Sequence, residues 1–148
     1  MAEDQRQALQ QLYIEQQMVA SNLENVQERL DVTNLYLSNY QKGLEVLHQL
    51  EKQDTESELF FNVGGGLFIE ARITQPVRII SDLGSGARVE VDRQQAIENA
   101  KEIIKKLEEQ RDSLRESAEQ MEARAVQLNA RMQELAEKIQ SEEGQPSV

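Results

Sequence analysis

The chain has 148 residues, of which 29% are charged and 4% are aromatic, and its formal net charge is -11. This composition argues against a compact globule and favours long helices that each bury one apolar stripe. The negative charge opposes binding to nucleic-acid phosphates or anionic lipid. The absence of cysteine excludes disulfides, thiolate zinc sites and cysteine nucleophiles.

The first predicted element is a helix over residues 5–52, in a segment that holds one glycine and no proline. Its apolar residues recur at alternating spacings of three and four, which is the heptad pattern of a coiled coil. The seam positions are Leu9, Leu12, Gln16, Val19, Leu23, Val26, Leu30, Thr33, Leu37, Tyr40, Leu44 and Leu47.

The middle segment, residues 57–92, changes to the two-residue period of β-strands. Strands are predicted at Leu67–Ile73, Val77–Asp82 and Ala87–Val91, with hairpin turns at 64–66 and 84–86, where glycines cluster. The sequence therefore predicts two β-hairpins joined by residues 74–76. Four short strands leave edges and one apolar face uncovered, which favours oligomerisation.

Asp92 is placed to cap a second helix over residues 93–141, followed by a disordered tail at 142–148. A second heptad seam runs along this helix at Ile97, Ala100, Ile104, Leu107, Arg111, Leu114, Ala118, Met121, Ala125, Leu128, Met132, Leu135 and Ile139.

The two seams match when the helices run antiparallel. Leu9 then faces Leu135, Leu12 faces Met132, and every seam position of the first helix meets one of the second. The polar exceptions Thr33 and Arg111 fall at the same level. A slide of seven residues would keep the seam but separate that pair, so this register is a hypothesis. A rise of 1.5 Å per residue gives an arm of roughly 70 Å. The fold class is α+β, in a single domain over residues 1–148.

The hairpin sequences carry a family resemblance. FFNVGGGLFIEARI resembles the first hairpin of alpha-type prefoldin subunits, and IISDLGSGARVEVDRQQAIE resembles the second hairpin and the start of the second helix. The resemblance covers nearly the whole chain, and two hairpins are typical of the alpha class. It implies that two alpha subunits join through their hairpins and that four beta-type subunits complete a hexamer with a double β-barrel body. It also implies that the arm tips hold non-native polypeptides without ATP and deliver them to a group II chaperonin.

Candidate client-binding residues lie near the two chain ends, which an antiparallel pairing brings together. Ile14 and Met18 fall outside the seam and face outward, and Tyr13 flanks it. Exposed apolar groups of this kind suit weak, sequence-tolerant contacts with unfolded chains. Frayed seam residues complete the candidate set, which is Leu9, Leu12, Tyr13, Ile14, Met18, Met132, Leu135 and Ile139. The alternative is that these are isolated surface residues or ordinary seam packing. A second outward cluster, Val32, Leu35 and Tyr36, could touch client or a neighbouring arm, or be an ordinary surface patch.

The candidate assembly surface lies on the hairpins, at Val63, Leu67, Ile69, Ala71, Ile73, Val77, Ile79, Val89 and Val91. Nothing in the sequence indicates catalysis or a cofactor. The glycines at 64–66 lack the Lys-Ser/Thr of a phosphate loop, and His48, the one histidine, has no cysteine partners for a metal. We expect no enzyme activity, no metal and no cofactor.

Two other functions compete with the chaperone. A structural tether, or the hinge of a long coiled-coil ATPase, would share the helix–β–helix order, but no nucleotide-binding half is present in the sequence. A nucleic-acid binder is opposed by the net charge. The amino end lacks the apolar core of a signal peptide, and no run reaches the roughly 20 apolar residues of a membrane span. We therefore expect a cytoplasmic protein.

Overall fold

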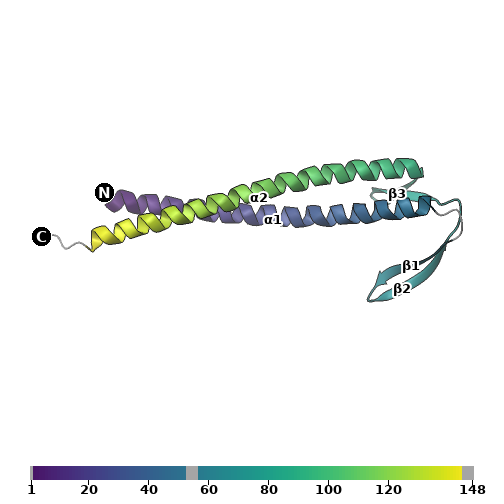
Figure 1. Cartoon of the computed structure of the whole chain (residues 1–148), viewed down its shortest axis with the longest axis horizontal. Coiled ribbons are helices and arrows are strands. Elements are labelled where there is room, and N and C mark those ends of the chain that lie inside the picture. Colours follow the sequence, from purple (N-terminus) through teal and green to yellow (C-terminus); the bar gives the residue numbers. More distant parts are fainter. Residues whose placement is uncertain (1, 53–56, 145–148) are drawn as a thin grey trace. The chain divides into compact units, whose positions relative to one another are not determined.

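The computed structural model describes residues 2–52 and 57–144. The element order is α1 (Ala2–Glu51), β1 (Ser57–Gly64), β2 (Leu67–Ile73), β3 (Ile79–Gly84), β4 (Ala87–Val91) and α2 (Arg93–Glu143) (Figure 1). The α+β fold class, two long helices joined by two β-hairpins, is confirmed. None of the described helices is long and apolar enough to cross a membrane.

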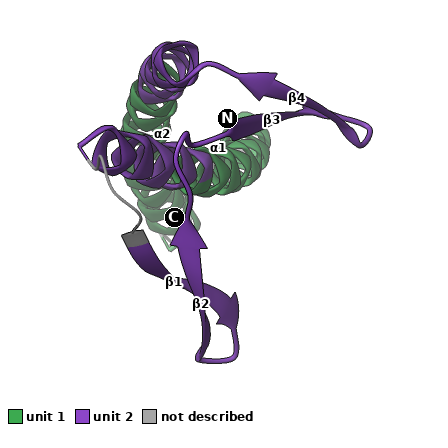
Figure 2. Cartoon of the chain, turned by 90° about the vertical axis from the view of Figure 1, so that its right-hand side faces the viewer, with its two compact units in different colours: residues 1–35, 109–148 green, residues 36–108 purple. Residues whose placement is uncertain are grey.

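The chain forms two compact units, which are described separately. Unit 1 comprises Met1–Leu35 and Glu109–Val148, and unit 2 comprises Tyr36–Glu108 (Figure 2). Unit 1 therefore contains the first part of α1 and the last part of α2. Unit 2 contains the remaining parts of both helices and all four strands.

Unit 1 is an antiparallel helix pair that buries the predicted seam. Leu128 is 0% exposed, and Val26 and Leu114 are also buried. Thr33 is buried as well, and the remaining seam residues of unit 1 are half-buried, whereas most residues between them are exposed. The heptad spacing produces this pattern because it keeps one stripe of each helix facing the other.

Polar contacts across unit 1 agree with the predicted register. The guanidinium of Arg124 donates to a carboxylate oxygen of Glu15, with Nε 2.9 Å away. Arg6 forms a second ion pair with Glu143. Both pairs join positions that flank the seam. A slide of seven residues, about 10 Å, would separate at least one of them.

The polar seam residues of unit 1 find partners close by. The hydroxyl of the buried Thr33 donates to the carbonyl oxygen of Arg29, one turn earlier, at 2.8 Å. A guanidinium nitrogen of Arg111 lies 3.1 Å from a carboxylate oxygen of its neighbour Asp112. The side-chain amide of Gln16 donates a hydrogen bond to the side-chain oxygen of Asn129 on the other helix. Thr33 therefore satisfies its hydrogen bond within its own helix and needs no polar side chain opposite.

In unit 2 the four strands form two separate two-stranded ribbons, β1–β2 and β3–β4. The two hairpin turns have the same hydrogen-bonding pattern. The side chain of Asn62 accepts a hydrogen bond from the backbone N–H of Gly64, and Asp82 does the same for Gly84. The two residues that follow each of these glycines have positive φ, as a tight hairpin turn requires. One of them is Ser85, at φ 54°, a conformation that costs most side chains energy.

Several element ends differ from the sequence-based expectation. β3 begins at Ile79 rather than Val77, because its partner β4 ends at Val91, which pairs with Ile79, just before α2 begins. α2 continues to Glu143, two residues further than predicted. Tyr40 is 38% exposed despite its seam position. The rest of the expected tail, 145–148, lies outside the described residues.

Candidate functional site: two apolar surfaces

The first candidate surface is on unit 1, where α1 begins and α2 ends. Ile14 and Met18, one turn apart on α1, are 52% and 61% exposed, and Tyr13 beside them is also exposed. Exposed apolar groups this close together make a surface suited to apolar partners. Met is well suited to varied partners because its side chain is flexible.

The other predicted client residues occupy the seam next to this surface. Each is half-buried, so it presents less apolar area than Ile14 or Met18: Leu9, Leu12, Met132, Leu135 and Ile139. The structure brings all eight predicted residues into unit 1. Val126 of α2, which the sequence analysis missed, is 69% exposed in the same unit. Val126 could have been found from the sequence, because it is a branched apolar residue outside the heptad seam.

An exposed ion pair also lies at this end of unit 1. Lys138 donates to Glu134 at 2.9 Å, one turn away on α2. That hydrogen bond, together with the positive charge of Lys138, lowers the pKa of the Glu134 carboxyl, and the same contact raises the pKa of Lys138. Both side chains lie in water, so the pair contributes little to stability.

The second candidate surface is formed by the ribbons of unit 2. The register of β1–β2 places Phe61 opposite Ile69 and Leu59 opposite Ala71, on one face. Phe60 and Phe68 lie on the other face, beside Glu70 and Asn62. The predicted assembly residues Val63, Leu67, Ile69 and Val89 are exposed, and Ala71, Ile73, Val77, Ile79 and Val91 are half-buried.

Sequence reasoning missed the aromatic part of this surface. Phe60 is 71% exposed, and Phe61 and Phe68 are also exposed, as are Ile80 and Leu83 on the second ribbon. All three phenylalanines of the chain fall on β1–β2. The alternation rule selects one face of a strand, and β1–β2 is apolar on part of both faces.

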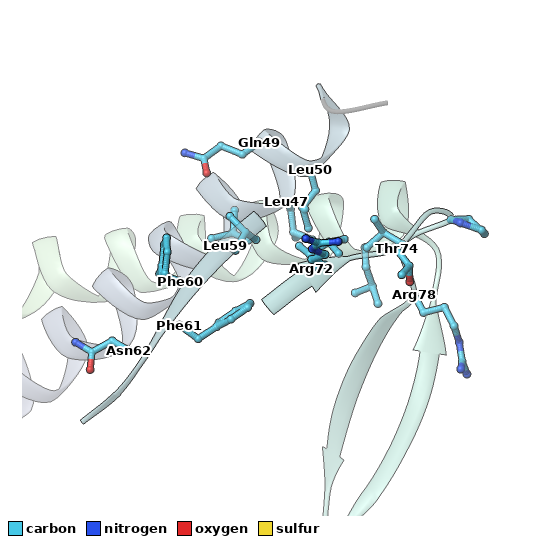
Figure 3. Close-up of a pocket in the computed structure, with 15 residues that line it drawn as sticks. Leu47, Gln49, Leu50, Leu59, Phe60, Phe61, Asn62, Arg72, Thr74 and Arg78 are labelled. Carbon is cyan, nitrogen blue, oxygen red and sulfur yellow. The ribbon is translucent and has the colours of Figure 1, made fainter. Parts of the chain in front are cut away.

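A hollow of about 730 Å³ lies between β1 and the end of α1 in unit 2. The lining residues include Leu47 and Leu50 of α1, Leu59, Phe60 and Phe61 of β1, and Arg72 and Arg78 (Figure 3). Arg72 pairs with Glu58 at 3.1 Å, and Arg78 pairs with Glu90 at 3.2 Å. Most of its lining residues are apolar and its arginines are paired, so the hollow suits a largely apolar partner surface.

Groups that could perform chemistry do not gather in the described part of the chain. No cluster of three or more His, Asp or Glu side chains there could hold a metal ion. The side chain of His48 is 43% exposed, and its Nδ1 lies 3.6 Å from a carboxylate oxygen of Glu51, three residues later.

The fold defines a class: a chain that pairs two long helices and carries two β-ribbons with exposed apolar side chains. Comparison with known proteins gives the family. The model of the prefoldin subunit family matches residues 19–138. The chain is 35% identical over 96 residues to a curated protein from Archaeoglobus fulgidus named prefoldin subunit alpha, covering 65% of this chain and 70% of that one.

A solved structure shares the fold. It is a cryo-EM structure of filamentous PFD from Methanocaldococcus jannaschii, with a TM-score of 0.59 and 16% identity, covering 78% of this chain and 95% of that one. The chain belongs to the prefoldin subunit family, as an alpha-type subunit. Membership supports a chaperone-type role and assembly with other prefoldin subunits.

Proposed function

We propose that this chain is a subunit of an ATP-independent holdase that captures unfolded polypeptides with the ends of its helical arms. The arm end is defined here as the part of unit 1 that contains residues 9–18 and 126–139. The observation that carries the proposal is the exposure of Ile14 and Met18 on the outward side of α1. Apolar side chains that no seam covers gain free energy by contacting the apolar groups of an unfolded chain.

Assembly is the second part of the proposal. Two copies join through their ribbons, and four beta-type subunits complete a hexamer whose body is a double β-barrel. Unpaired strand edges and exposed phenylalanines on β1–β2 support this part, because both need partners. Six arms then act together, so contacts that are individually weak sum to useful avidity. The held chain passes to a group II chaperonin in the cytoplasm.

The experiment measures suppression of aggregation without ATP. The chain is assembled with beta-type subunits, and the complex is titrated against denatured citrate synthase. The variant Ile14→Ser with Met18→Ser removes two half-exposed side chains, each contributing about 1 kcal/mol when a client covers it. We expect about thirtyfold more complex to be required for half protection, with the mass of the complex unchanged.

A matched variant, Val32→Ser with Leu35→Ser, removes exposed apolar groups farther from the arm end. It should lose much less protection. Full protection by the Ile14/Met18 variant would contradict the proposed site. Failure of the wild-type complex to protect at all would instead favour a structural tether. Loss of assembly in the Ile14/Met18 variant would show that these residues join subunits.

A further inference from the structure

Uncharged side chains occupy the outward positions of both helices of unit 1 near the arm end, that is, the three positions of each heptad farthest from the seam. On α1 these positions lie between the charged residues Arg6 and Glu24, and on α2 between Glu119 and Glu134; Glu122, Arg124 and Arg131, in the second range, flank the seam and are not outward positions. We call this set the amide band: Gln7, Gln10, Gln11, Ile14, Gln17, Met18 and Ser21 on α1, with Gln120, Ala123, Val126, Gln127, Ala130 and Gln133 on α2. All thirteen are exposed.

The absence of charge at these positions is unexpected. The outward face of a coiled-coil helix is normally its charged face. At the average charged share of this chain, 29%, about four of the thirteen positions would carry charge. The acid at the edge of the band, Glu15, is paired with Arg124 and so is partly neutralised.

The two halves of the band lie side by side. The ion pair between Glu15 and Arg124 and the hydrogen bond between Gln16 and Asn129 join the two helices within it. The same register places Met18 and Val126 at one level of the helix pair. The halves therefore form two uncharged outward faces at the same level of the helix pair. Charged side chains remain at the flanks of the seam, where Glu15 pairs with Arg124 and where Glu122 and Arg131 are exposed.

The chemistry of the band matches the peptide group. A glutamine side chain offers a carbonyl acceptor and an N–H donor, the same groups that an unpaired backbone exposes. Gln10, Gln11 and Gln17 surround Ile14 and Met18 at spacings of one to four residues, so amide and apolar groups alternate over short distances. Charged side chains would have to lose tightly bound water to admit an apolar segment. Amide side chains lose less on desolvation, and hydrogen bonds to the peptide groups of the segment offset that cost.

We infer that the amide band binds extended, uncharged segments of non-native polypeptide through their backbone peptide groups, while Ile14, Met18 and Val126 contact the apolar side chains between them. This inference rests on the proposed holdase function and adds the chemistry of the bound segment. An unfolded chain fits because it exposes unpaired N–H and C=O groups beside apolar side chains. A folded partner has already paired its backbone.

The first test adds charge to the band without changing side-chain size. The variant carries Gln10→Glu, Gln17→Glu and Gln127→Glu, and the matched control carries Gln41→Glu, Gln95→Glu and Gln110→Glu, which are exposed positions outside the band. Protection of denatured citrate synthase by the assembled complex is compared. The band variant should need at least fivefold more complex, and the control should stay within twofold of the wild type. Equal protection by the two variants would overturn the inference.

The second test probes the backbone directly. Binding of the wild-type complex to a fluorescent, uncharged, leucine-containing peptide is compared with binding to the same peptide methylated at alternate backbone nitrogens. Methylation should weaken binding at least fivefold, and raising sodium chloride from 0.05 to 0.5 M should change the affinity for the unmethylated peptide less than twofold. Equal binding of the two peptides, or a steep salt dependence, would overturn the inference.

These outcomes separate the two proposals. If Ile14→Ser with Met18→Ser abolishes protection while the glutamate variant is unaffected, apolar contacts alone hold the client. In that case the holdase function stands and the backbone recognition fails. If the glutamate variant instead forms a complex of lower mass, the band joins subunits and the inference is also wrong.

Discussion

Leu128 is the place where the packing of unit 1 is most sensitive to mutation. Its side chain is 0% exposed, in the seam between α1 and α2. Leu128→Ala removes three carbons from a closed site and leaves a cavity. Substitutions of this kind cost between 2 and 5 kcal/mol, and a two-helix seam can partly collapse, so we expect about 3 kcal/mol. At 2–4 °C per kcal/mol, the melting temperature should fall by roughly 6–12 °C.

Val126→Ala is the matched control, two residues away on the same helix and 69% exposed. It should change the free energy of unfolding by no more than about 0.5 kcal/mol. Thermal unfolding followed by circular dichroism measures both variants. If Leu128→Ala melts within 2 °C of the wild type, or if Val126→Ala is as destabilising as Leu128→Ala, the assignment of the seam is wrong.

Three further predictions concern the register, a turn and a surface pair. Leu12→Cys with Met132→Cys should form a disulfide on mild oxidation, seen as a mobility shift without reductant; no shift would count against the register. Ser85→Gly should stabilise the second ribbon by about 0.5–1 kcal/mol, since glycine tolerates positive φ. Slower hydrogen exchange of the backbone amides in β3 and β4 would show this stabilisation, and faster exchange would show that Ser85 is not strained. Lys138→Gln should raise the pKa of Glu134 towards its ordinary value in an NMR titration. The pair's small stabilisation is present above that ordinary value and is lost as the pH falls through the lowered pKa; an unchanged pKa would exclude the contact.

The helices were predictable because a heptad repeat is a long signal. Each seam residue lies on the same stripe of its helix, so the polar residues at seam positions 16 and 33, Gln16 and Thr33, do not obscure the repeat. The turns were also predictable from the sequence, because their positive φ values strongly favour glycine. The ends of β3 were not readable, because they depend on where β4 stops, and that depends on where α2 begins.

The candidate surfaces were predictable only in part. Ile14 and Met18 could be found as apolar residues outside the seam, and the same rule applied to α2 would have found Val126. Phe60 and Phe68 were missed because alternation assigns one apolar face to a strand, and these residues lie on the opposite face to Phe61. Sequence patterns show which residues a chain buries by itself, but they do not show which residues a partner covers.

The most direct measurement is photo-crosslinking from the arm end. A benzoylphenylalanine placed at position 18 of the assembled complex should capture a denatured client when irradiated, and the same probe at Lys105, an exposed residue of α2 in unit 2, should not. Capture at position 105 with none at position 18 would contradict the account. It would show that the ribbon-bearing unit, and not the arm end, receives the unfolded chain.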